Sequence, residues 1–157
     1  MSNIEIIGTR VLHEKIKEEM ITLTKRVSKA EGMYLLTRLE IYDQIICLKR
    51  NQKLFAFQLI QTFEQGDDKF VYFGPLFSRM SCFLELFMTY LQVLMEETVG
   101  RKVHLLAEIE NPEVLLLFKA LFDDCAYPKF QEEQVPEGVK NHVQTFKKSL
   151  AIFVTLM

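Results

Sequence analysis

Residues 69–122 read KFVYFGPLFSRMSCFLELFMTYLQVLMEETVGRKVHLLAEIENPEVLLLFKALF, and this stretch decides the fold. It predicts five elements in order: a strand at 69–74, a loop at 75–82, an apolar helix at 83–98, a strand at 102–109 and a helix at 113–122 introduced by Asn111 and Pro112. A strand, a helix and a second strand predict a crossover between parallel neighbours. The loop then precedes a helix N-terminus, where backbone N–H groups can bind an anion.

The segment before residue 69 predicts a helix followed by a meander. Apolar side chains recur every three or four positions between residues 11 and 30, which predicts an amphipathic helix that we expect Gly32 to end. Apolar runs separated by polar turns predict three antiparallel strands, at 44–48, 54–62 and 69–74. Residues 4–7 suit an edge strand or an unstructured tail, and we favour the strand.

The helix at 83–98 is apolar on more than one side. Its main stripe consists of Phe83, Phe87, Tyr90, Leu91 and Leu94, and it is widened by Leu84, Met88 and Met95. We expect such a helix to pack on the sheet and to contact other elements or another chain. This helix and the uncharged end at 150–157 therefore raise the possibility of a homo-oligomer or a protein partner, while burial within one domain is the other interpretation.

The chain after residue 122 is harder to assign. We expect a loop at 123–135 and a helix from Pro136 to residue 150, and residues 152–155 suit a strand as well as a helix. The sequence holds no internal repeat and no Pro/Gly-rich linker. We therefore expect a single domain over residues 1–157.

Composition excludes several classes of protein. The chain has 157 residues, of which 49% are hydrophobic and 25% charged, which is typical of a globular domain. Its net charge is −2 and its cations are scattered, so nucleic acid is not an expected partner. Three cysteines without close spacing predict neither a disulfide framework nor a zinc site. We therefore expect the protein to occupy a reduced, cytoplasmic compartment. Neither a secretion signal nor a membrane span of about 18 apolar residues is present, so we expect a soluble protein.

Residues 108–122, EIENPEVLLLFKALF, carry a resemblance to a known family. They resemble the segment of the GCN5-related N-acetyltransferases that runs from the fifth strand into the next helix, and the order of elements is similar over 39–122. The resemblance implies a mixed α/β (α+β) fold. Its central sheet would be mostly antiparallel with one parallel strand pair, and helices would cover both faces.

The resemblance also implies a site for acetyl-CoA or another acyl-CoA as co-substrate. Backbone groups of Phe73, Gly74, Pro75 and Leu76 would contact pantetheine, Arg79, Met80, Ser81 and Cys82 would meet the pyrophosphate, and Asn111 would border the site. Glycines of the family's Gln/Arg-x-x-Gly-x-Gly/Ala loop leave room for phosphate oxygens. Here Cys82 and Leu84 stand at the two glycine positions, so the coenzyme A-binding loop is degenerate.

Further departures concern the catalytic end of the resemblance. The tyrosine that commonly protonates the leaving thiolate falls at Phe118, which has no acidic proton, and Leu121 replaces a glycine. The family usually ends with two more strands, which we expect to be missing or supplied by another chain. The chain is thus identified as a divergent member of the family.

Individual polar residues allow two interpretations each. Arg79 either binds an anion or is merely solvated, and Glu108 either acts as a base or faces solvent. Cys82 either has a pKa lowered by the helix N-terminus or is an unreactive buried thiol, and the second is favoured. His13, His104 and His142 lack metal-ligand spacing, so we expect structural or surface roles and no metal site.

Two functions of different classes follow. The first is an N-acyltransferase that passes an acyl group from acyl-CoA to the amine of an unknown acceptor, mostly by positioning because no catalytic acid is identified. The alternative is a non-catalytic binding or assembly module that keeps the fold without binding coenzyme A. Another small α/β sensor domain is a third possibility.

Overall fold

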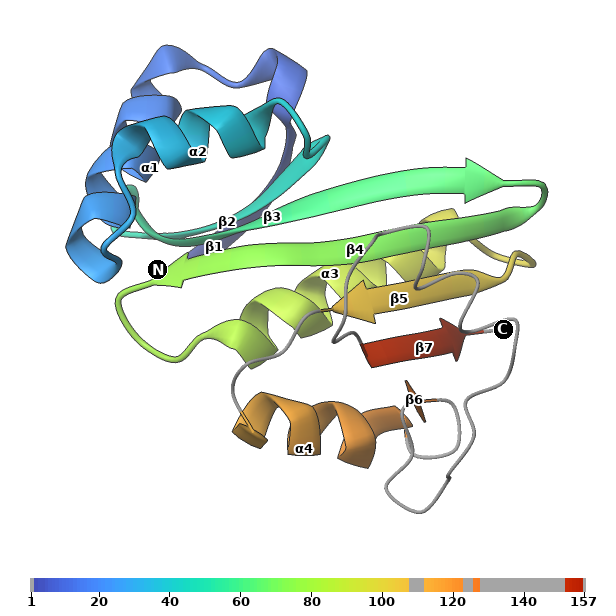
Figure 1. The fold of residues 1–157 in the computed structure, drawn as a ribbon. Coiled ribbons are helices and arrows are strands. Elements are labelled where there is room, and N and C mark those ends of the chain that lie inside the picture. Colours follow the sequence, from blue (N-terminus) through green and yellow to red (C-terminus); the bar gives the residue numbers. More distant parts are fainter. Residues whose placement is uncertain (1, 108–111, 123–125, 128–151, 157) are drawn as a thin grey trace. The chain divides into compact units, whose positions relative to one another are not determined.

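A computed structural model describes residues 2–107, 112–122, 126–127 and 152–156 (Figure 1). Its residues group into two units, Met1–Thr62 with Gly74–Val99 and Phe63–Phe73 with Gly100–Met157. The described elements are β1 (Ser2–Gly8), α1 (Glu14–Val27), α2 (Gly32–Leu39), β2 (Gln44–Arg50), β3 (Lys53–Gln65), β4 (Asp68–Ser78), α3 (Phe83–Glu97), β5 (Val103–Ala107), α4 (Pro112–Phe122), β6 (Ala126–Tyr127) and β7 (Ile152–Leu156). The single-domain assignment over residues 1–157 stays a prediction.

The described strands form a mixed sheet in the order β1-β2-β3-β4-β5-β7-β6. The ladders of β1 with β2, β2 with β3, β5 with β7 and β6 with β7 are antiparallel. β4 and β5 run parallel, with Lys69 opposite Val103 and Phe73 opposite Ala107. The mostly antiparallel sheet with one parallel pair that the sequence predicted is therefore confirmed.

The core of the first unit surrounds β2. Four consecutive residues of this strand, Ile45 to Leu48, are at most 1% exposed, so both faces of the strand are covered. Figure 1 shows α1 and α2 beside one face of β1–β3 and α3 beside the other. The hydroxyl of Tyr90 on α3 donates to Gln44 Oε1 on β2 at 2.9 Å. Helices on both faces are thus observed.

The core of the second unit contains an aromatic stack. The ring of Phe70 on β4 lies between Phe63, at a centroid distance of 4.7 Å, and His104 on β5, at 4.5 Å. All five residues of β5 are buried, as the nearly continuous apolar run of this strand predicted. Full burial of each large apolar side chain contributes about 1.5–3 kcal/mol to folding.

The sequence interpretation of Gly32 is wrong. α1 ends at Val27, where both the N–H and the hydroxyl of Ser28 donate to the Thr24 carbonyl, and Gly32 begins the unpredicted helix α2. A Cβ on Gly32 would lie 3.1 Å from Ile21 Cγ2 on α1. The glycine therefore allows α1 and α2 to approach closely. In sequence, a glycine with this role cannot be told from one that ends a helix.

The boundary predicted at Gly74 is also wrong. β4 continues through Pro75 to Ser78, so the loop before α3 is shorter than the predicted 75–82. Phe77 stacks on Phe57 of β3 with the ring centroids 5.0 Å apart. This packing keeps the chain extended beyond Pro75.

Two strands follow α4 within the described residues, contrary to the prediction that they are missing or supplied by another chain. β7 pairs with β5, with Val103 opposite Leu156, and β6 pairs with β7 inside the predicted loop at 123–135. The open assignment of residues 152–155 is thereby decided in favour of a strand. The helix predicted from Pro136 lies outside the described residues.

The side chains expected to widen the buried stripe of α3 are partly exposed. Leu86, Phe87, Tyr90 and Leu94 are buried, whereas Leu84, Met88 and Met95 are 47%, 45% and 44% exposed. The buried side of α3 is therefore narrower than expected, and a homo-oligomer or protein partner stays a prediction. In the part of the chain that the structure describes, no helix combines the length and the apolar character needed to cross a membrane.

Candidate functional site

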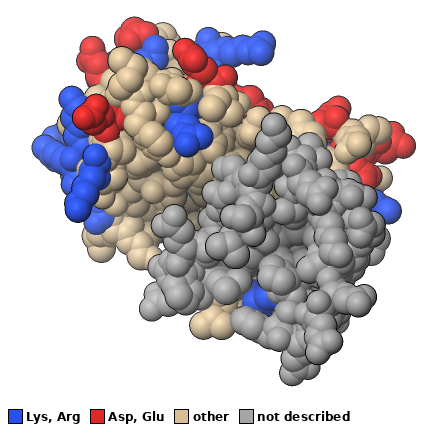
Figure 2. Space-filling model, in the orientation of Figure 1, with Lys and Arg blue, Asp and Glu red and all other residues tan. Residues whose placement is uncertain are grey.

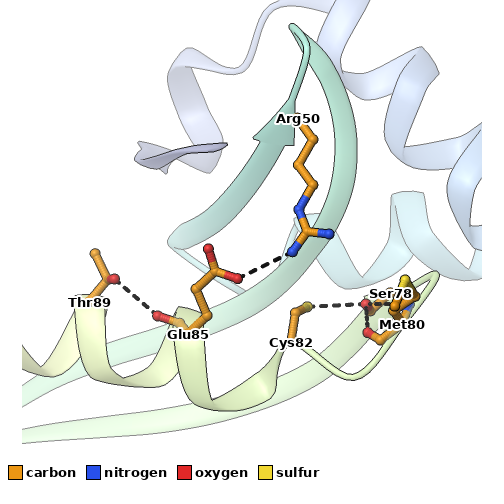
Figure 3. A network of polar contacts seen from close by, with 6 residues as sticks. All are labelled: Arg50, Ser78, Met80, Cys82, Glu85 and Thr89. Atoms are coloured by element: carbon orange, nitrogen blue, oxygen red, sulfur yellow. Dashed lines mark hydrogen bonds and ion pairs between the residues drawn. The ribbon is translucent and has the colours of Figure 1, made fainter. Parts of the chain in front are cut away.

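The connection from β4 to α3 is organised by Ser78. Its hydroxyl donates to the Met80 carbonyl, accepts from the Met80 N–H at 3.1 Å and lies 3.1 Å from Cys82 Sγ (Figure 3). A hydroxyl that bonds the backbone two residues ahead stabilises a turn locally. Sequence reasoning did not single out Ser78, although a serine at the start of a short polar loop is a recognisable signal.

The loop does not depend on glycine geometry. Among the described residues, positive φ angles occur at Asn51, Gln52, Gly66 and Gly100, and none of these lies between Ser78 and Leu84. Cys82 precedes the helix with φ −138°, and its buried side chain contacts Ser78. The two replaced glycines therefore cause no backbone strain here, and Leu84 adds a half-exposed side chain at the helix start.

Arg50 at the end of β2 is the cation that sequence reasoning missed. Its Nη2 lies 3.5 Å from Glu85 Oε2 in the first turn of α3, and its guanidinium lies 4.2 Å from the centre of the Phe55 ring. Arg50 Nε is buried with no hydrogen-bond partner in the described part of the chain. Figure 3 shows this side chain reaching toward α3. The sequence placed Arg50 in a polar turn, and only tertiary structure brings it to α3.

Electrostatics at this connection disfavour a reactive cysteine. Burial raises the pKa of the Cys82 thiol above its ordinary value, and the hydrogen bond to Ser78 offsets only part of this effect. Arg50 lowers and Glu85 raises the same pKa. These effects favour the unreactive thiol over the thiolate as the interpretation of Cys82.

Gly74 of β4 is held between two side chains of its own unit. A Cβ at this position would lie 2.4 Å from Cε1 of the buried Tyr42 ring, and the Gly74 carbonyl accepts from Gln58 Nε2 at 3.1 Å. Gln58 is itself 4% exposed, and its Oε1 has no partner among the described residues. Only glycine fits beside this ring as it stands.

The predicted site residues are only partly brought together. Gly74, Pro75, Leu76, Arg79, Met80, Ser81 and Cys82 follow one another in the first unit, and Phe73 is the last residue of the second-unit segment before them. Pro75 lacks an N–H, so it offers only a carbonyl to a ligand. Arg79, Met80 and Ser81 are exposed. Asn111 and Glu108 lie outside the described residues.

The residues considered for proton transfer and metal binding are Phe118 and the histidines, and those that the structure describes are buried, paired or next to a helix. Phe118 on α4 is 1% exposed. His104 Nε2 lies 2.9 Å from Asp68 Oδ2, so this buried histidine pairs with a partly exposed carboxylate. His13 precedes α1, and His142 is outside the described residues. Within the described ranges, no three His, Cys, Asp or Glu side chains are grouped to hold a metal.

Comparison with solved structures decides the fold. Tetrahymena GCN5 superposes with a TM-score of 0.63 at 10% sequence identity, over 99% of this chain and 96% of that one. The chain has the fold of the GCN5-related N-acetyltransferases. Escherichia coli ElaA superposes with a TM-score of 0.60 at 14% identity, over the whole of both chains. A ribosomal-protein-alanine N-acetyltransferase from Brucella melitensis gives 0.55 at 13% identity, over 87% of this chain and 99% of that one.

The acetyltransferase fold is thus shown by structure, as the resemblance at 108–122 implied. No protein-family model matches the sequence, and no curated protein is significantly similar to it. Because the chain has this fold, the third possibility, a small α/β sensor domain of another fold, no longer applies. The fold alone does not establish an activity, which depends on the residues around Ser78 and Arg50.

Proposed function

We propose that the chain binds acyl-CoA and transfers its acyl group to an amine. The observation that carries this proposal is the parallel pair β4 and β5, joined by α3 in an acetyltransferase fold. β4 ends at the loop that precedes α3, so the free N–H groups of the first helical turn are available to phosphate oxygens. The acceptor amine and the acyl group are left open.

The phosphates of the coenzyme would bind at the start of α3. Exposed Arg79 and the guanidinium of Arg50 would supply positive charge, together with the helix dipole. Glu85 opposes this, because its carboxylate occupies the same first turn and pairs with Arg50. The residues present therefore fit an anion, with an affinity reduced by Glu85.

In the proposed reaction, the amine nitrogen attacks the thioester carbonyl, the C–S bond breaks and the thiol leaves with a proton. Phe118 has no proton to donate, and the thiol of Cys82 is held protonated by burial. Positioning of the two reactants would therefore supply most of the rate acceleration. Burial of Tyr42 against Gly74 would keep this part of β4 rigid.

The alternative is a non-catalytic binding or assembly module with the same fold. The half-exposed Leu84 at a glycine position, the buried Phe118 and the neutralisation of Arg50 by Glu85 favour it. Both alternatives share the fold and differ in whether coenzyme A binds. A cytoplasmic location is a further prediction for either function.

Calorimetry with acetyl-CoA tests the proposal. We expect saturable heat for the unmodified chain, and an affinity about tenfold or more lower in Arg50→Ala/Arg79→Ala, since two cations near phosphates are removed. Lys15→Ala/Arg26→Ala is the matched control, because both are exposed cations on α1, beside the other face of the sheet from α3, and its affinity should stay unchanged. Absence of heat at millimolar acetyl-CoA would reject the acyltransferase and leave the binding module.

A further inference from the structure

A groove lies between α1 and α2, apart from the loop that precedes α3. Its volume is about 700 Å³, and it is lined by the end of α1, the connection at 28–31 and the start of α2. Gly32 makes the groove possible, because a Cβ there would lie 3.1 Å from Ile21 Cγ2 and 3.6 Å from Lys25 Cε. The volume lies within the range of small-ligand sites.

The lining of the groove is apolar in its middle. Ile21 on α1 and Met33 and Leu36 on α2 contribute side chains to it. Met33 is 68% exposed, so its side chain is accessible to a ligand. The groove therefore offers a place for one apolar side chain of a ligand.

The rim of the groove carries uncompensated positive charge. Lys25 and Lys29 line the groove, and Arg26 lies beside them at the end of α1. All three side chains are exposed and make no hydrogen bond or ion pair within the described ranges. Glu31 is the carboxylate among the lining residues. Figure 2 shows Lys and Arg side chains gathered at its left edge, over α1 and α2, although the whole chain has a net charge of −2.

We infer that this groove docks an acidic segment of a partner protein, whose carboxylates meet Lys25 and Lys29 while one apolar side chain rests on Met33. Charge complementarity selects an acidic occupant, since the free cations on the rim outnumber the carboxylate. The groove is shallow and open to solvent, so an extended peptide segment can lie along it.

Fluorescence anisotropy tests the inference with a labelled short peptide in which pairs of glutamates alternate with leucine. We expect saturable binding that weakens as salt screens the charges. Lys25→Glu/Lys29→Glu should lower the affinity about tenfold or more, because attraction becomes repulsion. The matched control Lys53→Glu/Lys102→Glu has the same change in net charge and should bind within about twofold of the unmodified chain.

A second pair of measurements examines the apolar contact. Met33→Ser should lower the affinity about threefold or more, and replacing leucine by alanine in the peptide should do the same. Met33 is largely exposed, so this variant retains the fold, which circular dichroism verifies. A peptide with lysine in place of glutamate should not bind.

Several outcomes would overturn the inference. They are absence of peptide binding, equal binding by Lys25→Glu/Lys29→Glu, binding of phosphatidylserine vesicles without peptide binding, and concentration-dependent self-association that Lys25→Glu/Lys29→Glu abolishes. Acetyl-CoA calorimetry on the same samples separates this inference from the proposed function. The groove variants should leave the heat of acetyl-CoA binding unchanged.

Discussion

The start of α3 and the groove between α1 and α2 both carry cations, but in different surroundings. At α3, Arg50 lies against Phe55 and 3.5 Å from the carboxylate of Glu85. In the groove, Lys25 and Lys29 are exposed and without partners among the described residues. An anion at α3 must therefore compete with a carboxylate already present, whereas one in the groove meets uncompensated charge.

The difference indicates that a helix N-terminus does not by itself determine how strongly its surroundings attract an anion. At the start of α3 the helix dipole attracts an anion by about 0.3–1 kcal/mol at an exposed site. The carboxylate of Glu85 already takes up part of this attraction. The groove also includes a helix N-terminus, that of the short α2, and its lysines remain available.

The largest expected effect is on the glycines that shape the two regions. Gly74→Ala should lower the free energy of unfolding by about 2–3 kcal/mol, because its methyl group would overlap the buried Tyr42 ring. Chemical denaturation measures this change. Tyr42→Leu/Gly74→Ala should recover part of the loss relative to Tyr42→Leu alone, since the overlapping ring is gone.

Gly32→Ala is the matched control at the groove. Its methyl group would meet Ile21 Cγ2 at 3.1 Å, which a small side-chain shift relieves, and alanine improves helix propensity by up to about 1 kcal/mol. The free energy of unfolding should therefore change by less than about 0.5 kcal/mol. A loss as large as that of Gly74→Ala would contradict the contrast between the two glycines.

The second effect concerns alkaline pH and the buried strand that ends at Arg50. Burial raises the pKa of the Cys47 thiol from 9.0 to about 12. Above pH 9 the unfolded chain loses this proton while the folded chain keeps it, so stability falls as pH rises, by about 1.4 kcal/mol per pH unit. Denaturation between pH 9 and about 10.5 should show this slope, with the contribution of other groups removed by comparison with Cys47→Ala.

Cys47→Ala should remove the contribution of Cys47 to the slope of unfolding free energy against pH. This holds even if the substitution lowers stability at neutral pH. Native thiol labelling gives an independent check, because Cys47 should react slowly below pH 9. An unchanged slope in Cys47→Ala would show that the thiol does not titrate differently in the two states.

The smallest effect is a change in acetyl-CoA affinity at the start of α3. Glu85→Gln should raise the affinity about threefold, because it removes the carboxylate that competes with phosphate for Arg50. Calorimetry measures this change. Glu96→Gln, near the other end of the same helix, is the matched control and should have no effect. A lower affinity in Glu85→Gln would mean that the carboxylate positions Arg50 for the ligand.

Much of the fold was predictable because it follows from local periodicity. Apolar residues at helical spacing identified α1, α3 and α4, and alternating runs with polar turns identified the meander. The parallel pairing of β4 and β5 followed from the helix between them. α2 was missed because a glycine that permits close helix packing and one that ends a helix look alike in sequence.

The candidate site was predictable only in part. The resemblance and the place before a helix led to residues 79–82 as pyrophosphate contacts, which stay a prediction, and the phenylalanine at 118 was recognised as a ring without an acidic proton. Arg50, Glu85 and the packing of Tyr42 on Gly74 were not recognised, because they join segments far apart along the chain. The groove between α1 and α2 was also not predicted, since α2 itself was missed.

By itself, the sequence determined most of the helices and strands, though not α2 or β6, and that β4 and β5 run parallel, because hydrophobic spacing and turn residues act over a few neighbouring positions. Tertiary structure alone decided which charges meet. Arg50 is paired with Glu85 on α3, whereas Lys25 and Lys29 remain available on the groove. The reason is physical: electrostatic interaction depends on distance and burial in space, and neither is contained in the order of residues along the chain.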